Sequence, residues 1–243
     1  MSKTKFTILL VSISVFLIAG TCNGQSDEIH ILIFSKTAGF RHSSIEAGIM
    51  ALESLAKKEG YVTVQTEDAS IFNDKELKRF NAVIFLNTTG DVLDLDQQAD
   101  FERFIQAGGG YMGIHAASDT EYDWEWYGRL AGAYFKSHPK IQPAKLIVEN
   151  NAHPATNSLP PVWQKTDEWY NFGYISDQIN VLIRIDEKSY EGGENGAYHP
   201  MSWYQEFDGG RSFYTAMGHT EESYQDPLYM QHISGGLKFV IKK

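Results

Sequence analysis

The sequence predicts an α/β protein with a mainly parallel central sheet covered by helices on both faces. Continuous apolar runs at 29–35 and 81–87 are typical of strands buried on both faces. Each run precedes a stretch with helical periodicity, at 43–60 and at 94–107. Such alternation indicates parallel strands joined by helical crossovers.

The remaining elements follow from local signals. A capping box of Ser43 and Glu46 is expected to open the first helix, and Gly60 to end it. Further strands are predicted at 61–66 and 108–115, with a short helix at 73–80 between them. Later strands are predicted at 145–150, 179–186, 201–207 and 211–218, the last two joined by a hairpin at 208–210. A helix is expected at the C-terminal end.

Size and charge restrict the class of protein. The chain has 243 residues, which suits one domain over 25–243. Its net charge is −10, which argues against binding nucleic acid or an anionic membrane surface by general electrostatics. It also has 13 Tyr, 14 Phe and 5 Trp, many in polar stretches late in the chain. Aromatic rings in polar loops suit a sugar or another flat ligand.

The first 24 residues resemble a secretory signal peptide. Lys3 and Lys5 precede an apolar stretch from Phe6 to Ala19, which is short for a membrane span. We therefore expect an exported protein, periplasmic or at the cell surface, that meets the membrane only through this signal or a lipid on Cys22. An uncleaved anchor is the alternative. Cys22 is the single cysteine, so the domain at 25–243 contains no thiol nucleophile.

Three loops are expected to converge on one edge of the sheet. In parallel α/β sheets, ligands bind beyond the carboxyl ends of the strands. The loops that follow the strands at 29–35, 81–87 and 108–115 carry Arg41 with His42, residues 88–91, and His115 with Asp119. Topology therefore predicts that His42 and His115 are neighbours.

His115 occupies the sharp small-residue turn of "YMGIHAASD", where several hydrolase folds place a nucleophile. An imidazole there suits a general base, a metal ligand or a hydrogen-bonding filler. His42 and Arg41 precede a helix N-terminus, which favours an anionic or hydroxyl-rich ligand, although His42 also suits a purely structural role.

Two later stretches add acids and a third histidine. In "TDEWYNF", Asp167 and Glu168 are adjacent, so we expect one of them to face a site; a solvated turn is the alternative. In "GHTEES", His219 precedes Glu221 by two residues, a spacing compatible with a base and its orienting acid. A divalent metal such as zinc is compatible with His42, His115, His219 and Glu168, although no close-spaced metal motif is present.

The chain resembles the ThuA-like (trehalose utilisation) family, within the class I glutamine-amidotransferase-like fold. The resemblance spans about 28–242 and is carried by "FSKTAGFRHSSI", "FLNTTGDVL", "GGGYMGIHAASDTEYDWEWYGRLAGAYFKSHP", "DEWYNF", "HPMSWYQEFDGGRSFYTAMGHT" and "HISGGLKFV". It implies a flavodoxin-like three-layer sandwich. His219 and Glu221 match the family's His-x-Glu pair, whereas His115 stands where the amidotransferases have cysteine. Glutaminase activity is therefore not expected.

The resemblance also implies a role in the catabolism of trehalose-like disaccharides, alongside a sugar oxidoreductase that produces keto-sugars. We expect an exported protein that acts on a glycoside or keto-sugar by isomerisation, elimination or hydrolysis, with catalytic His42, His115, His219 and Glu168. A non-catalytic sugar-binding protein and a metal-dependent glycoside hydrolase are the alternatives. The expected sugar-binding residues are Arg41, Asp119, Trp124, Trp126, Trp169, Tyr170, Trp203 and Arg211.

Overall fold

The computed structural model describes residues 1 and 28–241, and the predicted signal peptide lies outside the described part of the chain. Five strands of the central sheet run parallel in the order β2-β1-β3-β4-β11. This order is that of flavodoxin-like folds. The strands are β1 (His30–Phe34), β2 (Val62–Thr66), β3 (Ala82–Leu86), β4 (Gly110–Ile114) and β11 (Gly210–Thr215).

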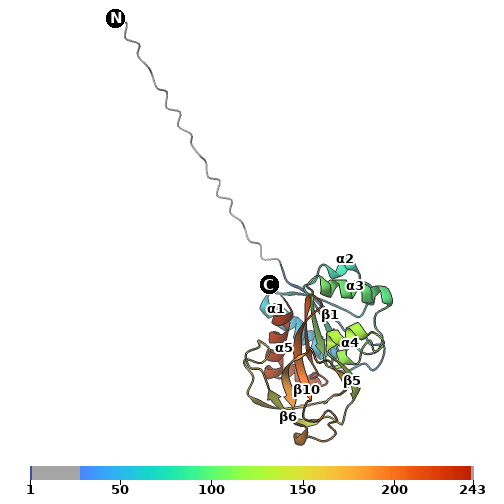
Figure 1. The fold of residues 1–243 in the computed structure, drawn as a ribbon, viewed down its shortest axis with the longest axis vertical. Coiled ribbons are helices and arrows are strands. Elements are labelled where there is room, and N and C mark those ends of the chain that lie inside the picture. Colours follow the sequence, from blue (N-terminus) through green and yellow to red (C-terminus); the bar gives the residue numbers. More distant parts are fainter. Residues whose placement is uncertain (2–27, 242–243) are drawn as a thin grey trace.

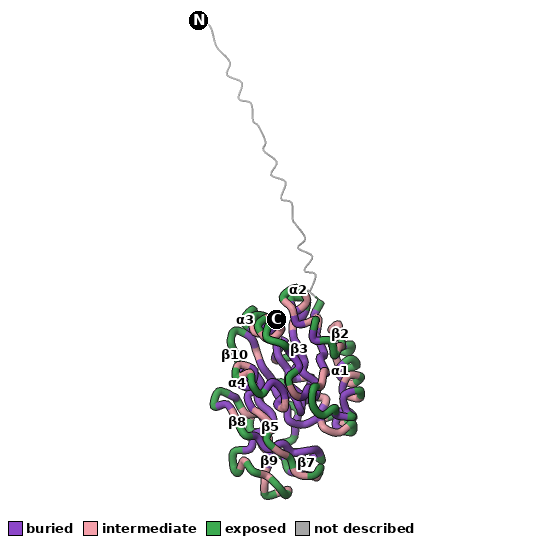
Figure 2. Tube along the Cα trace, turned by 90° about the vertical axis from the view of Figure 1, so that its right-hand side faces the viewer, coloured by how far each residue is buried: buried purple, intermediate pink, exposed green. Residues whose placement is uncertain are grey.

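Helices cover both faces of this sheet, which confirms the predicted three-layer α/β class (Figure 1). One face packs against α1 (Ile45–Glu59) and α5 (Pro227–Val240). The other packs against α3 (Leu95–Gln106) and α4 (Glu125–Ala131), with the short α2 (Asp74–Leu77) beside α3. Figure 2 shows the buried strands between these exposed helical surfaces.

The second half of the chain extends the sheet with antiparallel strands, in the order β10-β9-β6-β7 beyond β11. They are β10 (Pro200–Phe207), β9 (Asn180–Ile185), β6 (Gln142–Val148) and β7 (Val162–Asp167). A separate antiparallel pair joins β5 (Ala133–Ser137) to β8 (Asn171–Ile175). The predicted β10–β11 hairpin is confirmed, with Asp208 and Gly209 at φ 48° and 95° in its turn.

The antiparallel half curls back toward the parallel half. In strand order β7 is four places from β11, yet the Asp167 carboxylate at its end accepts hydrogen bonds from the backbone N–H groups of Gly218 and His219 (3.0 and 3.1 Å) just after β11. β7 runs in the same direction as β11, because three antiparallel pairings and one antiparallel hairpin separate them. Its carboxyl end therefore reaches the edge of the sheet where β1, β3, β4 and β11 also end.

The predicted start of the first helix is wrong. Helix α1 begins at Ile45, and its N-cap residue is Ser44, whose side chain makes no capping hydrogen bond. The Ser44 hydroxyl instead donates to the carbonyl of Gly218 (3.2 Å), while Glu46 pairs with Arg41. Gly60 ends the helix in the left-handed conformation, as predicted. Within the described residues, no helix is both long and apolar enough to cross a membrane.

Candidate functional site

The predicted convergence of loops at the carboxyl edge is confirmed. Ala38 N–H donates to the carbonyl of Thr89 (2.7 Å), and Gly90 N–H donates to the carbonyl of Asp119 (2.8 Å). The loops after β1, β3 and β4 are therefore linked directly through their backbones. Around this edge the structure gathers His42, His115, Glu168 and His219.

His115 lies at a sharp turn between β4 and a 3-10 helix over His115–Ser118. Its φ of 49° is a left-handed conformation that costs a non-glycine residue energy and is often found at functional positions. Its Nδ1 lies 2.7 Å from the carbonyl oxygen of Ala216. Because a carbonyl only accepts, Nδ1 must carry a proton, so Nε2 is the nitrogen that faces the site.

His219 lies on the loop that follows β11. Hydrogen bonds with Asp167 and with Ser44 hold this loop in place. Asp167 accepts from the N–H groups of Gly218 and His219, and the Ser44 hydroxyl donates to the carbonyl of Gly218. The His219 Nδ1 atom then lies 3.1 Å from Nε2 of His115. Its ring is one-fifth exposed, so this histidine forms part of the accessible side of the cluster.

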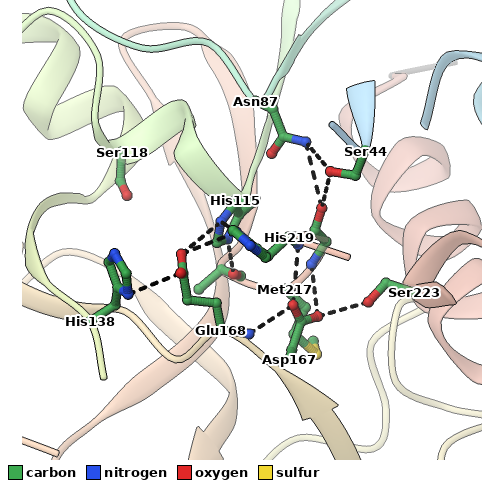
Figure 3. Close-up of polar contacts among 12 residues, drawn as sticks. Ser44, Asn87, His115, Ser118, His138, Asp167, Glu168, Met217, His219 and Ser223 are labelled. Atoms are coloured by element: carbon green, nitrogen blue, oxygen red, sulfur yellow. Dashed lines mark hydrogen bonds and ion pairs between the residues drawn. The ribbon is translucent and has the colours of Figure 1, made fainter. Parts of the chain in front are cut away.

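Glu168 comes immediately after β7, and its side chain is buried. Its Oε2 atom lies 3.1 Å from Nδ1 of His219 and 3.5 Å from Nε2 of His115, while Oε1 lies 2.9 Å from Nδ1 of His138 (Figure 3). Burial acts to raise the pKa of this carboxyl, but hydrogen bonds and charge from His115 and His219 outweigh it and hold the pKa well below its usual range. The same contact raises the pKa of His219 against the opposing effect of burial.

His42 completes the cluster from the loop after β1. Its ring is perpendicular to those of His115 and His219, with centroid separations of 4.9 and 5.1 Å. Burial, followed by the nearby charges of His115 and His219, lowers its pKa to about 3. It is therefore neutral at physiological pH, and its buried Nδ1 atom has no hydrogen-bond partner among the described residues.

Together these four residues form a group that could hold a metal ion. One ligand atom from each lies within 4.8 Å of all the others. Ligand atoms about 2.0–2.1 Å from a tetrahedral ion are about 3.3 Å apart, close to the 3.1, 3.1 and 3.5 Å separations among His115, Glu168 and His219. The fixed tautomer of His115 and the neutral, unpartnered ring of His42 also suit coordination.

Several residues outside the predicted set support this cluster. The Asn87 amide, at the end of β3 with φ 51°, donates to the hydroxyl of Ser44 (3.1 Å). Buried Lys165 donates to the hydroxyl of Ser223 (2.8 Å), which donates in turn to Asp167 (2.8 Å). The sequence placed Asn87 at a strand end, but its contacts with Ser44 depend on the fold.

The alternative of a solvated turn at 166–172 is wrong, since every residue from Asp167 to Phe172 is buried. Adjacent acids do point in different directions, with Glu168 in the cluster and Asp167 beneath the His219 loop. The structure leaves Glu221 exposed, and the His219 ring contacts the carboxylate of Glu168 instead.

Two of the residues predicted to bind sugar lie beside the cluster. The Tyr170 ring packs 4.2 Å from that of His115 and is buried. The carboxylate of Asp119 accepts from the hydroxyl of Tyr122 (2.7 Å), and partial burial raises its pKa. Arg41 also lies near this edge, but its guanidinium pairs with Glu46 and Glu67 (2.7 and 2.8 Å).

The remaining predicted sugar-binding residues lie elsewhere. Trp169 and Trp203 are fully buried, and their indoles donate to the carbonyls of Gln142 and Ala131 (2.8 Å each). In the layer of α3 and α4, Trp124 donates to Glu102 and Trp126 to Asp208, 3.0 Å each. Arg211 is the second residue of β11 and pairs with Gly110 at the start of β4, so it lies at the opposite end of the strands from the cluster.

Fold and site define a class: a flavodoxin-like α/β protein with a histidine–glutamate cluster at the carboxyl edge of its central sheet. The chain belongs to the ThuA family, described as trehalose utilisation, whose model matches residues 30–240. A search of curated proteins gives no match.

Solved structures agree with this fold. A putative ThuA-like protein from Bacteroides uniformis is 24% identical, with a TM-score of 0.75, and the match covers 88% of this chain and 92% of that one. One from Parabacteroides merdae is 16% identical, also with a TM-score of 0.75, and the match covers 88% and 90%. The match to a β-galactosidase from Bacillus circulans covers only 30% of that chain, with 11% identity and a TM-score of 0.57. At these low sequence identities, the similarity shows a shared fold and nothing more.

Proposed function

We propose that the protein is a metal-dependent enzyme acting on a glycoside or keto-sugar, with His42, His115, Glu168 and His219 as ligands of one divalent ion. The observation that carries the proposal is the meeting of three imidazoles and a carboxylate within 4.8 Å. Histidine with carboxylate suits zinc and neighbouring transition metals better than magnesium or calcium. Such an ion supplies Lewis-acid polarisation of a carbonyl or hydroxyl oxygen, or activation of water.

The chain's own residues would orient the ligands and handle the proton. The carbonyl of Ala216 fixes the tautomer of His115, and Asp167 fixes the backbone of His219. Glu168 connects the cluster to His138, whose side chain is 45% exposed. This arrangement supports proton movement between a buried centre and solvent, as isomerisation, elimination and hydrolysis of sugars all require.

The sugar part of the proposal comes from the family's description and from charge. The family is described by trehalose utilisation. Arg41, in the loop that carries His42, is already paired with two carboxylates. A neutral, hydroxyl-rich substrate therefore suits this edge better than a strongly anionic one.

The test is turnover of a panel of glycosides and 3-keto-glycosides by wild type, His219→Ala and the control His30→Ala, at the start of β1. We expect turnover that a chelator abolishes and zinc or manganese restores, absent in His219→Ala and normal in His30→Ala. Turnover that survives chelation would contradict the proposed dependence on a metal ion. Sugar binding without turnover of any panel member would contradict the enzyme and support the accessory role.

Export through residues 1–24 is part of the same proposal. Mass spectrometry of the mature N-terminus distinguishes cleavage after Gly24 from lipidation of Cys22. An intact Met1 on protein recovered from the producing cells would contradict export by a cleaved signal.

A further inference from the structure

One large apolar side chain beside the cluster is left uncovered. Phe40, in the loop after β1, is 67% exposed. Its ring is perpendicular to that of His42, with the centroids 4.9 Å apart. Since His42 contacts both His115 and His219, Phe40 is separated from the centre of the cluster by a single imidazole.

The backbone around Phe40 is held rigidly. Thr89 accepts at its carbonyl from the N–H groups of Ala38 and Gly39 (2.7 and 3.2 Å), and its hydroxyl donates to the carbonyl of Phe40 (2.9 Å). Because this backbone is already ordered, a ligand that packs on the ring has less chain entropy to remove.

The polar groups nearby suit hydroxyls. The Tyr122 hydroxyl occupies only one oxygen of the Asp119 carboxylate, and Tyr122 itself is 44% exposed. The Arg41 guanidinium, next to Phe40, is held by Glu46 and Glu67. This side of the site therefore offers a carboxylate acceptor and an apolar face, and the charge of Arg41 is already neutralised.

We propose that Phe40 is a stacking platform for one uncharged pyranose ring of the substrate, with Asp119 accepting its hydroxyls, so that the site selects unphosphorylated over phosphorylated sugars. The apolar C–H face of a pyranose packs on an aromatic ring as other flat ligands do. The inference rests on the proposed function, because it places the sugar next to the metal-ligand cluster.

The experiment measures binding of α,α-trehalose and of trehalose 6-phosphate by calorimetry. Its variants are Phe40→Ala, Phe40→Trp and the control Met50→Ala, which removes a comparably exposed side chain (66%) from the surface of α1. We expect Phe40→Ala to weaken trehalose binding about tenfold, Phe40→Trp to retain it and Met50→Ala to leave it unchanged. Wild type should bind trehalose at least about tenfold more tightly than its 6-phosphate.

The inference is overturned if Phe40→Ala binds trehalose as tightly as wild type, if the phosphate binds more tightly, or if neither sugar binds. Metal content measured on the same samples separates this result from the proposed function. Phe40-dependent sugar binding by a protein without metal would leave the platform standing and overturn the metal-dependent mechanism. One metal ion per chain, with sugar binding that does not depend on Phe40, would overturn the platform and leave the metal-dependent mechanism standing.

Discussion

The Nε2 atom of His115 lies 3.1 Å from the Nδ1 atom of His219, although 104 residues separate them in the chain. One ring comes from the turn after β4 and the other from the loop after β11. These strands are adjacent and parallel, so both side chains emerge at the same edge of the sheet. Glu168 then approaches both rings from β7, which the curl of the sheet brings to this edge.

Asp167 is predicted to act as a positioning residue for His219. In Asp167→Asn, an amide N–H group replaces an oxygen that accepts from the loop backbone. We expect a stability loss of about 1–3 kcal/mol and metal affinity reduced about 10–100-fold. Zinc titration and chemical unfolding measure the two effects. Glu221→Gln, an exposed acid two residues beyond His219, is the control; an equal loss of affinity in both variants would refute this role.

Gly218 should be required for the same loop. Its φ is 113°, and an added Cβ would lie 2.5 Å from the hydroxyl oxygen of Tyr229. We expect Gly218→Ala to destabilise the protein by about 3 kcal/mol and to weaken metal binding, because the loop must shift. Gly60→Ala is the matched control, since Gly60 also has a positive φ (76°) but nothing within 4 Å of its added Cβ. It should cost about 1 kcal/mol and leave metal binding intact; similar metal affinities in the two variants would contradict the role of this loop.

Metal affinity should depend on pH in the neutral range. The ring of His219 must lose its proton to coordinate, and Glu168 raises its pKa above the usual 6.5 in the metal-free protein. As pH is lowered, metal affinity should therefore begin to fall while the pH is still above 6.5, and it should continue to fall below that pH. His42 adds nothing to this dependence above pH 4, because its pKa is about 3. Zinc titrations from pH 5 to 8 provide the measurement, and constant affinity across that range would contradict coordination by His219.

Buried His232 should make the fold sensitive to acid. Its Nδ1 atom contacts the carbonyl of Ala155 and its Nε2 atom the hydroxyl of Ser202, and burial lowers its pKa to about 4. Below pH 6.5 the unfolded chain binds a proton at this position that the folded chain does not, so stability is lost as pH falls toward 4. The loss amounts to ~3 kcal/mol. In chelator, His232→Gln should show a shallower fall in the free energy of unfolding than wild type; identical slopes would contradict the assignment.

Much of the fold was predictable from local pattern. Strands β1 and β3 are buried on both faces and appear in the sequence as apolar runs, and the order of strands and helices places their following loops together. The neighbourhood of His42 and His115 follows from that topology alone. Family resemblance then correctly identified the chain as ThuA-like.

The site residues beyond these two depended on tertiary structure. Contact of Glu168 with His219 requires the antiparallel half to curl back, which no local pattern encodes. The burial of an aromatic side chain also depends on tertiary structure. Trp203 is buried, with its indole N–H donating to the carbonyl of Ala131, whereas Phe40 remains exposed. The Ser44 hydroxyl likewise donates to the carbonyl of Gly218 and does not cap helix α1, a choice that also depends on tertiary structure.

The central claim is that His42, His115, Glu168 and His219 bind one divalent ion. Calorimetric titration of the chelator-stripped protein with zinc tests it most directly, on wild type, His219→Ala and His30→Ala. We predict one ion per chain for wild type and His30→Ala, and affinity reduced more than about 100-fold in His219→Ala, since losing even an outer partner of a ligand costs 10- to 100-fold. No zinc binding by wild type, or equal binding by His219→Ala, would contradict the claim.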